Sequence, residues 1–368
     1  MKIKICLLIE RLNSGGAERS AGLISQIIER LGHDVFIITL FDDIAYPYSG
    51  KLINIGEFNH CSGSILNRFN RYWQLRKQLH QNKFDLVFDF RLKESIIREF
   101  FLNKLVFSTR MVNMVRSFHL NWYFSNPKIV SKHLYRNYSG INTVSLEIEK
   151  EIERLFKFSN VSTIYSPIDI EYIQRKSQEA NYIEDDYIIG VGRLEPIKQF
   201  DKLLLAYKES VLPKENVKLY ILGKGSQKTN LLKLIIDLNL GNMVKIIPFN
   251  ENPFIYIRNA KFLISSSKNE GFPRVLLESM ACETPVISFD CSSGPSEIIV
   301  DGNNGLLVEN QNFEALKDAI DIMFLDKELY RECKANSLKS ISKFSMESIS
   351  VKWKQYINSL ILGNKFIS

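Results

Sequence analysis

The stretch that decides the fold is FLISSSKNEGFPRVLLE, residues 262–278, in the second half of the chain. Its apolar beginning predicts a buried β-strand, and a polar loop containing Glu270 follows. Pro273 suits the first turn of a helix, because a helix start needs no N–H donor there. Another apolar run, Pro285–Phe289, comes after the helical segment. Strand, helix and strand in this order predict a βαβ unit and therefore a parallel sheet.

The same alternation extends in both directions through the second half. Helical patterns such as Gln199–Ser210 and Thr229–Leu238 separate the apolar runs, and an amphipathic helix is expected at Met346–Leu362. Repeated strands with helical crossovers predict a doubly wound sheet. The five strands expected here are Tyr187–Val191, Lys218–Leu222, Val244–Pro248, Lys261–Ser266 and Pro285–Phe289.

The first half begins with a βαβ unit of its own, formed by a strand at Ile3–Ile9, a helix at Ala17–Leu31 and a strand at Asp34–Leu40. Further short strands are expected at Phe84–Phe90 and Asn142–Ser145. We therefore expect two Rossmann-like α/β domains facing each other across a cleft. The expected boundaries are 1–165 for the first domain, 166–186 for a linker, 187–345 for the second domain, and 346–368 for a last helix that packs back toward the first domain.

Composition is that of a globular protein, with 45% hydrophobic and 24% charged residues in a chain of 368. The five cysteines are odd in number and include no C-x-x-C pair, which argues against a disulfide framework or a zinc site and for the cytoplasm. No apolar run is long enough to span a membrane. We expect a cytoplasmic protein, with peripheral attachment to the inner face of the cell membrane as a further hypothesis.

Positive charge is concentrated in the first half, where residues 1–165 contain 23 Lys and Arg against 15 Asp and Glu. Such a surface suits an anionic partner or is simply solvated. Arg68–Lys83 reads RFNRYWQLRKQLHQNK, and its aromatic residues Phe69, Tyr72 and Trp73 suit an anionic membrane surface. A basic surface helix with its aromatics packed inward is an equal alternative.

Two loops are candidate phosphate sites. Arg193 and Lys198 flank a proline turn just after an expected strand, at the edge where doubly wound sheets bind ligands. Arg binds phosphate through a planar fork and Lys adds a point charge. The glycines of SGGAER, residues 14–19, lie between a strand and its helix, where backbone N–H groups attract anions. Exposed basic residues and an ordinary tight turn are the respective alternatives.

Sugar hydroxyls have their own candidates. Glu270 is expected in the loop after a strand and Glu278 just over one turn into the next helix, facing the same crevice. A carboxylate such as Glu278 accepts from both hydroxyls of a ribose, and the N–H groups of Gly271 and Phe272 suit a sugar. His119 follows an apolar stretch and suits a cleft loop, although a packing or surface histidine is the more common arrangement.

Several other chemistries are disfavoured. Gly223-Lys224-Gly225 resembles the start of a dinucleotide fingerprint, but Lys228 stands where the third glycine belongs, which weakens a dehydrogenase interpretation. We find no acidic pair of the D-x-D kind, no His/Cys cluster, no Walker loop and no G-x-S-x-G elbow. A catalytic metal or a bound cofactor is therefore not expected.

The order of motifs resembles glycosyltransferase family 4, retaining enzymes of the GT-B fold. The motifs are SGGAER (14–19), VGRLEPIKQ (191–199), LYILGKGS (219–226), SSSKNEGFPRVLLESMACETPVI (265–287), GPSEII (294–299) and DGNNGLLV (301–308). The likeness covers nearly the whole chain and is strongest from Tyr187 to Val308. Bacterial enzymes that build O-antigen, capsule or related glycans on a lipid carrier are the most similar in character.

The resemblance implies a role for each matching position. Arg193 and Lys198 match the pair that neutralises the donor diphosphate, Glu270 lies near the donor sugar and Glu278 binds the ribose. His119 resembles the family's cleft histidine. The resemblance places the donor beside Gly16, Gly223, Phe249, Gly271 and Phe272. Phe249 stands where the family often has a glycine next to the nucleobase.

We therefore expect a retaining transferase that moves a hexose or N-acetylhexosamine from a nucleoside-diphosphate sugar, with UDP as the first candidate, to a glycan. The expected partners are the nucleotide-sugar donor and a glycan or polyprenyl-diphosphate-linked acceptor, with an anionic membrane surface as a hypothesis and no nucleic acid. The alternatives are another GT-B enzyme, such as a sugar-nucleotide epimerase or glycan phosphorylase, and a non-catalytic protein that only binds the nucleotide sugar.

Overall fold

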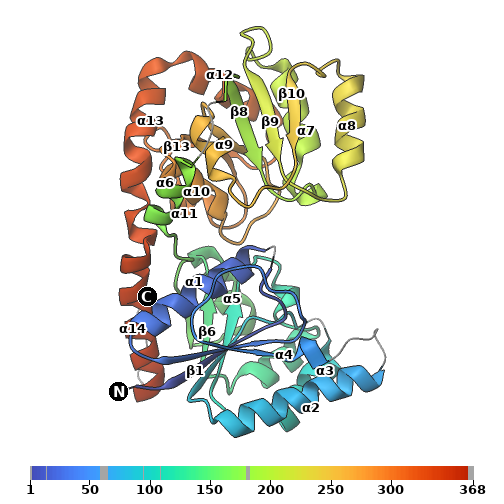
Figure 1. Cartoon of the computed structure of the whole chain (residues 1–368), viewed down its shortest axis with the longest axis vertical. Coiled ribbons are helices and arrows are strands. Elements are labelled where there is room, and N and C mark those ends of the chain that lie inside the picture. Colours follow the sequence, from blue (N-terminus) through green and yellow to red (C-terminus); the bar gives the residue numbers. More distant parts are fainter. Residues whose placement is uncertain are drawn as a thin grey trace. The chain divides into compact units, whose positions relative to one another are not determined.

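The structure is a computed structural model that describes residues 2–13, 15–58, 65–93, 95–107, 109–179 and 183–363. Ser14 and Cys61 lie outside the described residues. The chain forms two compact units. The first runs to Pro167 and is completed from Met346 onward, and the second is Ile168–Ser345. Each unit is built from one parallel sheet with helices on its faces (Figure 1), which confirms the predicted doubly wound α/β class.

The first unit contains a seven-stranded sheet with the strand order β3-β2-β1-β4-β5-β6-β7 over the described residues. All of its strand pairs are parallel. The order reverses between β1 and β4, which is the topological switch point of this sheet. The strands are β1 Lys4–Ile9, β2 Asp34–Thr39, β3 Lys51–Asn54, β4 Leu86–Asp89, β5 Met111–Val115, β6 Gly140–Thr143 and β7 Val161–Thr163.

Helix α14, Met346–Leu362, brings the end of the chain into the core of the first unit. Its Trp353 ring lies 5.3 Å from the Phe88 ring of β4, centroid to centroid, and is fully buried. The other helices of the unit are α1 Gly16–Arg30, α2 Ile65–Asn82, α3 Ile96–Phe101, α4 Lys128–Tyr135 and α5 Leu146–Phe156, with the short turns η1 Gly56–Phe58, η2 Leu102–Val106 (a π-helical turn) and η3 Leu120–Trp122.

The second unit contains a six-stranded parallel sheet with the order β10-β9-β8-β11-β12-β13, so its switch point lies between β8 and β11. The strands are β8 Tyr187–Val191, β9 Lys218–Leu222, β10 Val244–Ile247, β11 Leu263–Ser265, β12 Val286–Asp290 and β13 Gly305–Glu309. The helices are α6 Ile170–Ser177, α7 Phe200–Glu209, α8 Lys228–Asp237, α9 Phe254–Asn259, α10 Arg274–Ala281, α11 Pro295–Ile298, α12 Phe313–Leu325 and α13 Lys327–Ser340, with the short turns η4 Pro196–Lys198 and η5 Ser342–Phe344.

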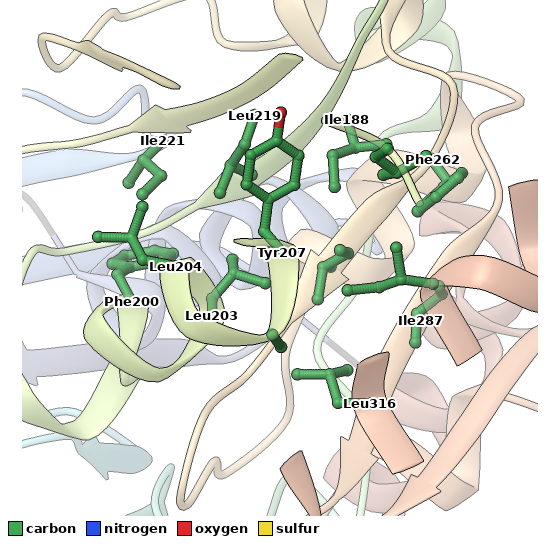
Figure 2. Packing of buried hydrophobic residues seen from close by; sticks show 14 of the residues in the cluster. Ile188, Phe200, Leu203, Leu204, Tyr207, Leu219, Ile221, Phe262, Ile287 and Leu316 are labelled. Carbon is green, nitrogen blue, oxygen red and sulfur yellow. The ribbon is translucent and has the colours of Figure 1, made fainter. Parts of the chain in front are cut away.

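Helix α7 fixes the core of the second unit against the central strands (Figure 2). Phe200, Leu203, Leu204 and Tyr207 recur at helical spacing on one face of α7 and are all buried. The Tyr207 hydroxyl donates to the Val217 carbonyl at 2.6 Å, so its polar end is satisfied inside the core. Burying a large apolar side chain contributes about 1.5–3 kcal/mol, so this face anchors the loop between β8 and α7 firmly to the sheet.

The expected linker, residues 166–186, is wrong as a description of this stretch, because it contains helix α6. Asp169 caps α6 by accepting from the Tyr172 N–H at 2.9 Å, and Ile173 is buried. This helix belongs to the second unit. The sequence interpretation also omitted four strands, which are β3, β5, β7 and β13.

The described cysteines Cys6, Cys282, Cys291 and Cys333 are unpaired and buried. Burial raises the pKa of the Cys291 thiol to about 12, with a further contribution from the nearby Glu270 carboxylate, which favours the neutral thiol over the thiolate. Among the helices the structure describes, none is long and apolar enough to cross a bilayer.

Candidate functional site

The candidate site lies where the strand order of the second sheet reverses. Doubly wound sheets bind ligands at the carboxyl ends of the strands on either side of such a point. β8 ends at Val191 and leads into Gly192–Lys198, while β11 ends at Ser265 and leads into the loop with Glu270. The two loops that the sequence singled out therefore flank the same switch point.

Lys198 and Glu270 meet across this switch point. The Lys198 ammonium lies 2.5 Å from Glu270 Oε1, and both side chains are largely buried, with 18% and 16% of their surfaces exposed. The Lys198 carbonyl accepts from the Ser266 hydroxyl at 2.8 Å, and the Lys268 N–H donates to the Ile197 carbonyl at 2.9 Å. These bonds hold the end of η4 against the loop after β11, so both charged groups have a fixed backbone.

Arg193 is arranged differently from Lys198. Its side chain is exposed and, among the described residues, its guanidinium forms no hydrogen bond or ion pair. The neighbouring Glu195 is turned toward the next loop, where it accepts from the Ser226 hydroxyl at 2.7 Å and from its N–H at 3.0 Å. These bonds lower the pKa of Glu195 below its ordinary value. Arg193 is thus available to an anion, while Glu195 ties the loops after β8 and β9 together.

Position 223 requires a glycine for a structural reason. The Gly192 N–H donates to the Leu222 carbonyl at 3.0 Å, and a Cβ placed on Gly223 would collide with the Gly192 carbonyl oxygen. The glycine therefore allows the loops after β8 and β9 to approach closely.

The segment from Glu270 to Pro273 is packed against the loop that follows β12. The Ser293 hydroxyl donates to the Gly271 carbonyl at 2.6 Å. Gly294 has a φ of +95°, and a Cβ there would lie 2.6 Å from Pro273 Cδ, so only glycine fits. The Phe272 ring packs edge-on against Phe344 at 5.3 Å, which commits this side chain to the core and limits its expected role to the backbone.

Helix α10 begins at Arg274, one residue after Pro273, and presents Glu278 from its second turn. Glu278 is buried, with 7% of its surface exposed. Arg274, also buried, places its Nε 3.8 Å from Glu278 Oε1. The sequence analysis missed Arg274, although its i,i+4 spacing from Glu278 was a usable signal. This arginine places a positive charge next to the buried carboxylate.

Phe249 follows β10 at the same sheet edge, and 49% of its surface is exposed. The Lys224 ammonium lies 4.6 Å from the centre of the Phe249 ring, a cation–π arrangement. An exposed aromatic ring next to a cation is a suitable stacking surface for a nucleobase.

Gly16 and His119 belong to the first unit. Gly16 is the first residue of α1, directly after the loop that follows β1, and the N-cap residue Gly15 has no side chain that could cap the helix. His119 precedes η3, after β5, and is half-buried with its ring 4.8 Å from the Trp122 ring. Both residues lie after the carboxyl ends of strands in their own sheet, and their roles toward the donor stay predictions.

A metal site has no support among the residues that the structure describes, since no three His, Cys, Asp or Glu side chains lie together there. Metal-independent chemistry stays a prediction, to be decided by assay.

The sequence matches two family profiles that together cover most of the chain. The profile for Glycosyltransferase Family 4 matches residues 14–172, and the profile for Glycosyl transferases group 1 matches residues 173–340.

Curated relatives and solved structures agree with these profiles. The chain is 31% identical, over 92% of its length and 95% of the relative's, to N-acetylgalactosamine-N,N'-diacetylbacillosaminyl-diphospho-undecaprenol 4-alpha-N-acetylgalactosaminyltransferase of Campylobacter jejuni. It is 25% identical, over 96% and 98%, to a second transferase of that organism, a GalNAc-alpha-(1->4)-GalNAc-alpha-(1->3)-diNAcBac-PP-undecaprenol alpha-1,4-N-acetyl-D-galactosaminyltransferase. A crystal structure of Anabaena HepE in complex with UDP and glucose superimposes with a TM-score of 0.77 at 18% identity, covering 97% of this chain and all of the other, which shows a common GT-B fold. The chain belongs to glycosyltransferase family 4 and is a glycosyltransferase of the GT-B fold.

Proposed function

We propose that the enzyme transfers a hexose or N-acetylhexosamine from a nucleoside-diphosphate sugar, with UDP as the first candidate, to a hydroxyl of a lipid-linked glycan, and that it retains the anomeric configuration of the donor. The observation that carries this proposal is the Lys198–Glu270 pair at the switch point of the second sheet. A cation and a carboxylate held side by side suit a ligand with an anionic diphosphate next to a neutral, hydroxyl-rich sugar.

The chemistry assigns each charge a task. The bond between the sugar C1 and the diphosphate oxygen breaks, and negative charge builds up on the leaving phosphate. Lys198 and the exposed Arg193 stabilise that charge electrostatically. The acceptor oxygen forms its bond to C1 on the face that the phosphate leaves, and the acceptor proton passes to a phosphate oxygen. Glu270 accepts hydrogen bonds from the sugar hydroxyls, and its negative charge stabilises the positive charge that develops on the sugar ring.

The remaining donor contacts follow the same sheet edge. Glu278, which lies next to Arg274, accepts from the ribose hydroxyls. Phe249 provides an exposed ring for the nucleobase. In the first unit, the start of α1 at Gly16 offers the positive end of a helix dipole to a phosphate, and His119 donates to a sugar or phosphate oxygen.

The acceptor class rests on the relatives. Both Campylobacter transferases have names that specify a glycan on an undecaprenyl diphosphate. We propose an acceptor of this class and a place in bacterial surface-polysaccharide biosynthesis, of which lipopolysaccharide and capsule are the candidate products.

A lipid-linked acceptor requires access to a membrane, and the first unit has a surface suited to it. Helix α2 buries Leu75 and Leu79 but leaves Phe69 and Trp73 each 59% exposed. Phe69 and Trp73 therefore do not show the inward packing that the alternative, an ordinary basic surface helix, requires. The Phe69 ring lies 6.1 Å from the Phe101 ring of α3, so the two helices adjoin (Figure 1).

Further apolar side chains are exposed on α3 and on η2, the turn that contacts both α2 and α3. The exposed apolar residues of these three adjoining elements are called the α2–α3 patch, which consists of Phe69, Trp73, Ile97, Phe100 and Leu105. Exposed Arg76 and Lys77 of α2 add positive charge, and the Lys77 ammonium lies 5.7 Å from the Trp73 ring. The Arg68 side chain lies outside the described residues. Apolar groups beside cations match an anionic lipid surface, and we propose peripheral binding to the cytoplasmic leaflet through this patch.

A donor screen followed by a product assay tests the function. Among UDP- and GDP-sugars, the correct donor should raise the unfolding temperature, because a ligand that binds only the folded state stabilises it. That donor should then yield an extended glycan with a polyprenyl-diphosphate-linked acceptor. Stabilisation by donor without transfer to any lipid-linked glycan would reject the acceptor class. Product analysis also distinguishes transfer from epimerisation or phosphorolysis.

A further inference from the structure

A fully buried group of four charged side chains lies at the switch point of the first sheet. Asp89 ends β4, Arg91 and Lys93 follow it, and Glu99 comes from α3; each is at most 1% exposed. Arg91 donates to both Asp89 carboxylate oxygens at 2.9 and 2.8 Å and lies within 3.5 Å of Glu99. The sequence analysis assigned no role to these residues, and the donor contacts proposed above do not use them.

Burying such a group costs free energy, because each charge loses its hydration. Apolar residues of similar size would fill the same space at a lower cost. The charges therefore point to a requirement for a fixed geometry at this position, next to the strand ends where ligands bind.

Lys93 links this group to the turn that contains His119. Its ammonium lies 3.3 Å from Asp89 Oδ2 and donates to Asn113 Oδ1 at 2.8 Å and to the Arg91 carbonyl at 3.1 Å. These contacts fix the Lys93 backbone, whose N–H donates to the Trp122 carbonyl at 2.5 Å. The Lys93 carbonyl in turn accepts from the Ser125 hydroxyl.

Trp122 in turn contacts His119 through its backbone and its ring. The Trp122 N–H donates to the His119 carbonyl at 3.0 Å, and the two rings lie 4.8 Å apart. We infer that Lys93 is a positioning residue, which holds the His119–Trp122 turn and thereby the imidazole in the orientation that the reaction needs. This inference rests on the proposed function, because it requires His119 to contribute to transfer.

A double-mutant cycle tests the inference on the full-length enzyme. Lys93→Met should lower kcat about tenfold with the KM for donor changed less than about twofold, because most of the proposed donor contacts lie on the second sheet. In a His119→Ala background the same substitution should change kcat by less than about twofold, since no imidazole remains to be oriented. An equal loss in both backgrounds, or an unaffected His119→Ala enzyme, would overturn the inference.

Two further variants guard against trivial results. Glu99→Gln changes the same buried group on its α3 side, where the carboxylate accepts from Arg91 and Arg98, and should leave kcat within about twofold of the wild type. Ser125→Ala removes only the hydroxyl that donates to the Lys93 carbonyl, and it should lower kcat as Lys93→Met does. If the Lys93→Met variant does not fold, Ser125→Ala takes its place in the double-mutant cycle.

A readout without turnover separates this inference from the proposed function. The His119 ring resonance, assigned in histidine-labelled protein by comparison with His119→Ala, should shift in Lys93→Met and Ser125→Ala but not in Glu99→Gln. An unshifted resonance in the first two variants overturns the positioning role even if the acceptor is unknown. If these two variants show the shift but the wild-type enzyme transfers no sugar, only the proposed function is contradicted.

Discussion

The Lys198 ammonium and the Glu270 carboxylate are 2.5 Å apart, and they join the loops after β8 and β11 on the two sides of the strand-order reversal. The pair places opposite charges at the edge of the second sheet where we propose that the diphosphate and its sugar lie side by side. Each proposal about the donor follows from this relationship.

The diphosphate pair is expected to matter most for turnover. Lys198→Ala and Arg193→Ala should each lower kcat/KM by about 10²-fold or more, comparable to the loss of an oxyanion-hole donor. Steady-state kinetics with the donor found in the screen measures the effect. Lys228→Ala, an exposed lysine at the start of α8, is the matched control and should be neutral. Near-wild-type turnover in either site variant would place the diphosphate elsewhere.

Glu278 is expected to act through the ribose. Glu278→Ala should weaken the affinity for UDP alone by about tenfold, because a charged group's hydrogen bonds to the ribose hydroxyls are lost. Calorimetric titration with UDP measures this without any sugar or acceptor. Glu314→Ala, on the exposed side of α12, controls for a general loss of charge. If a folded Glu278→Ala enzyme binds UDP as tightly as the wild type, the ribose site is elsewhere.

The sequence predicted that Lys198 and Glu270 lie in loops after strands, because strand, loop and helix follow one another locally at the switch point. It did not predict α6, since Pro167 and a run of polar residues indicated a linker, while the capping contact of Asp169 and the packing of Ile173 appear only in three dimensions. Strands β3 and β7 have four and three residues, too short for an apolar period to stand out.

The burial of the charged group at the end of β4 could not be predicted from the sequence, for a different reason. Arg91, Lys93 and Glu99 read as a solvated segment, because charged side chains are almost never fully buried unless paired. Their pairing depends on Asp89 and Asn113, which come from adjacent strands. The roles of Gly16 and His119 also stay predictions, because they come from a resemblance and not from a contact.

The α2–α3 patch is expected to bind anionic lipid. The wild type should float with vesicles that contain phosphatidylglycerol, less so at high salt, and poorly with phosphatidylcholine alone. Phe69→Ser combined with Trp73→Ser should abolish flotation, because the apolar anchor is removed. Ile236→Ser, on α8 and 71% exposed in the wild type, should leave it unchanged. Equal, salt-independent recovery with both vesicles would rule out this role.

Asp185 should make the stability of the second unit depend on pH. It accepts from Lys218 and Lys245 at 2.5 Å each and from the Tyr220 hydroxyl, and these bonds hold its pKa well below the ordinary value of 3.8. A carboxyl group whose pKa is lowered by folding contributes stability above its unfolded pKa and loses it as the pH falls below that value.

Asp185→Asn should therefore lower the free energy of unfolding by about 1 kcal/mol at neutral pH. Urea unfolding at several pH values should show a constant difference from the wild type between about pH 7 and 5, and a shrinking one below about pH 4. Asp186→Asn is the control, since Asp186 is 72% exposed and has one ion pair, with Lys261. A difference that grows on acidification would contradict this account.

Transfer is expected to need no divalent metal. In the proposed site, Lys198, Arg193 and helix starts provide positive charge at the diphosphate, and we therefore expect that no cation is needed on the same oxygens. The purified enzyme should keep its activity in excess EDTA. Loss of activity in EDTA, restored by magnesium or manganese, would show that the phosphate site has been misassigned.

The anomeric configuration of the product, determined by NMR, tests the central claim most directly. With a nucleotide sugar of known configuration and a lipid-linked acceptor analogue, we predict a new glycosidic bond with the configuration of the donor. This outcome follows if the acceptor attacks on the face that the phosphate leaves, next to Lys198 and Glu270. A product of inverted configuration would contradict the proposed mechanism.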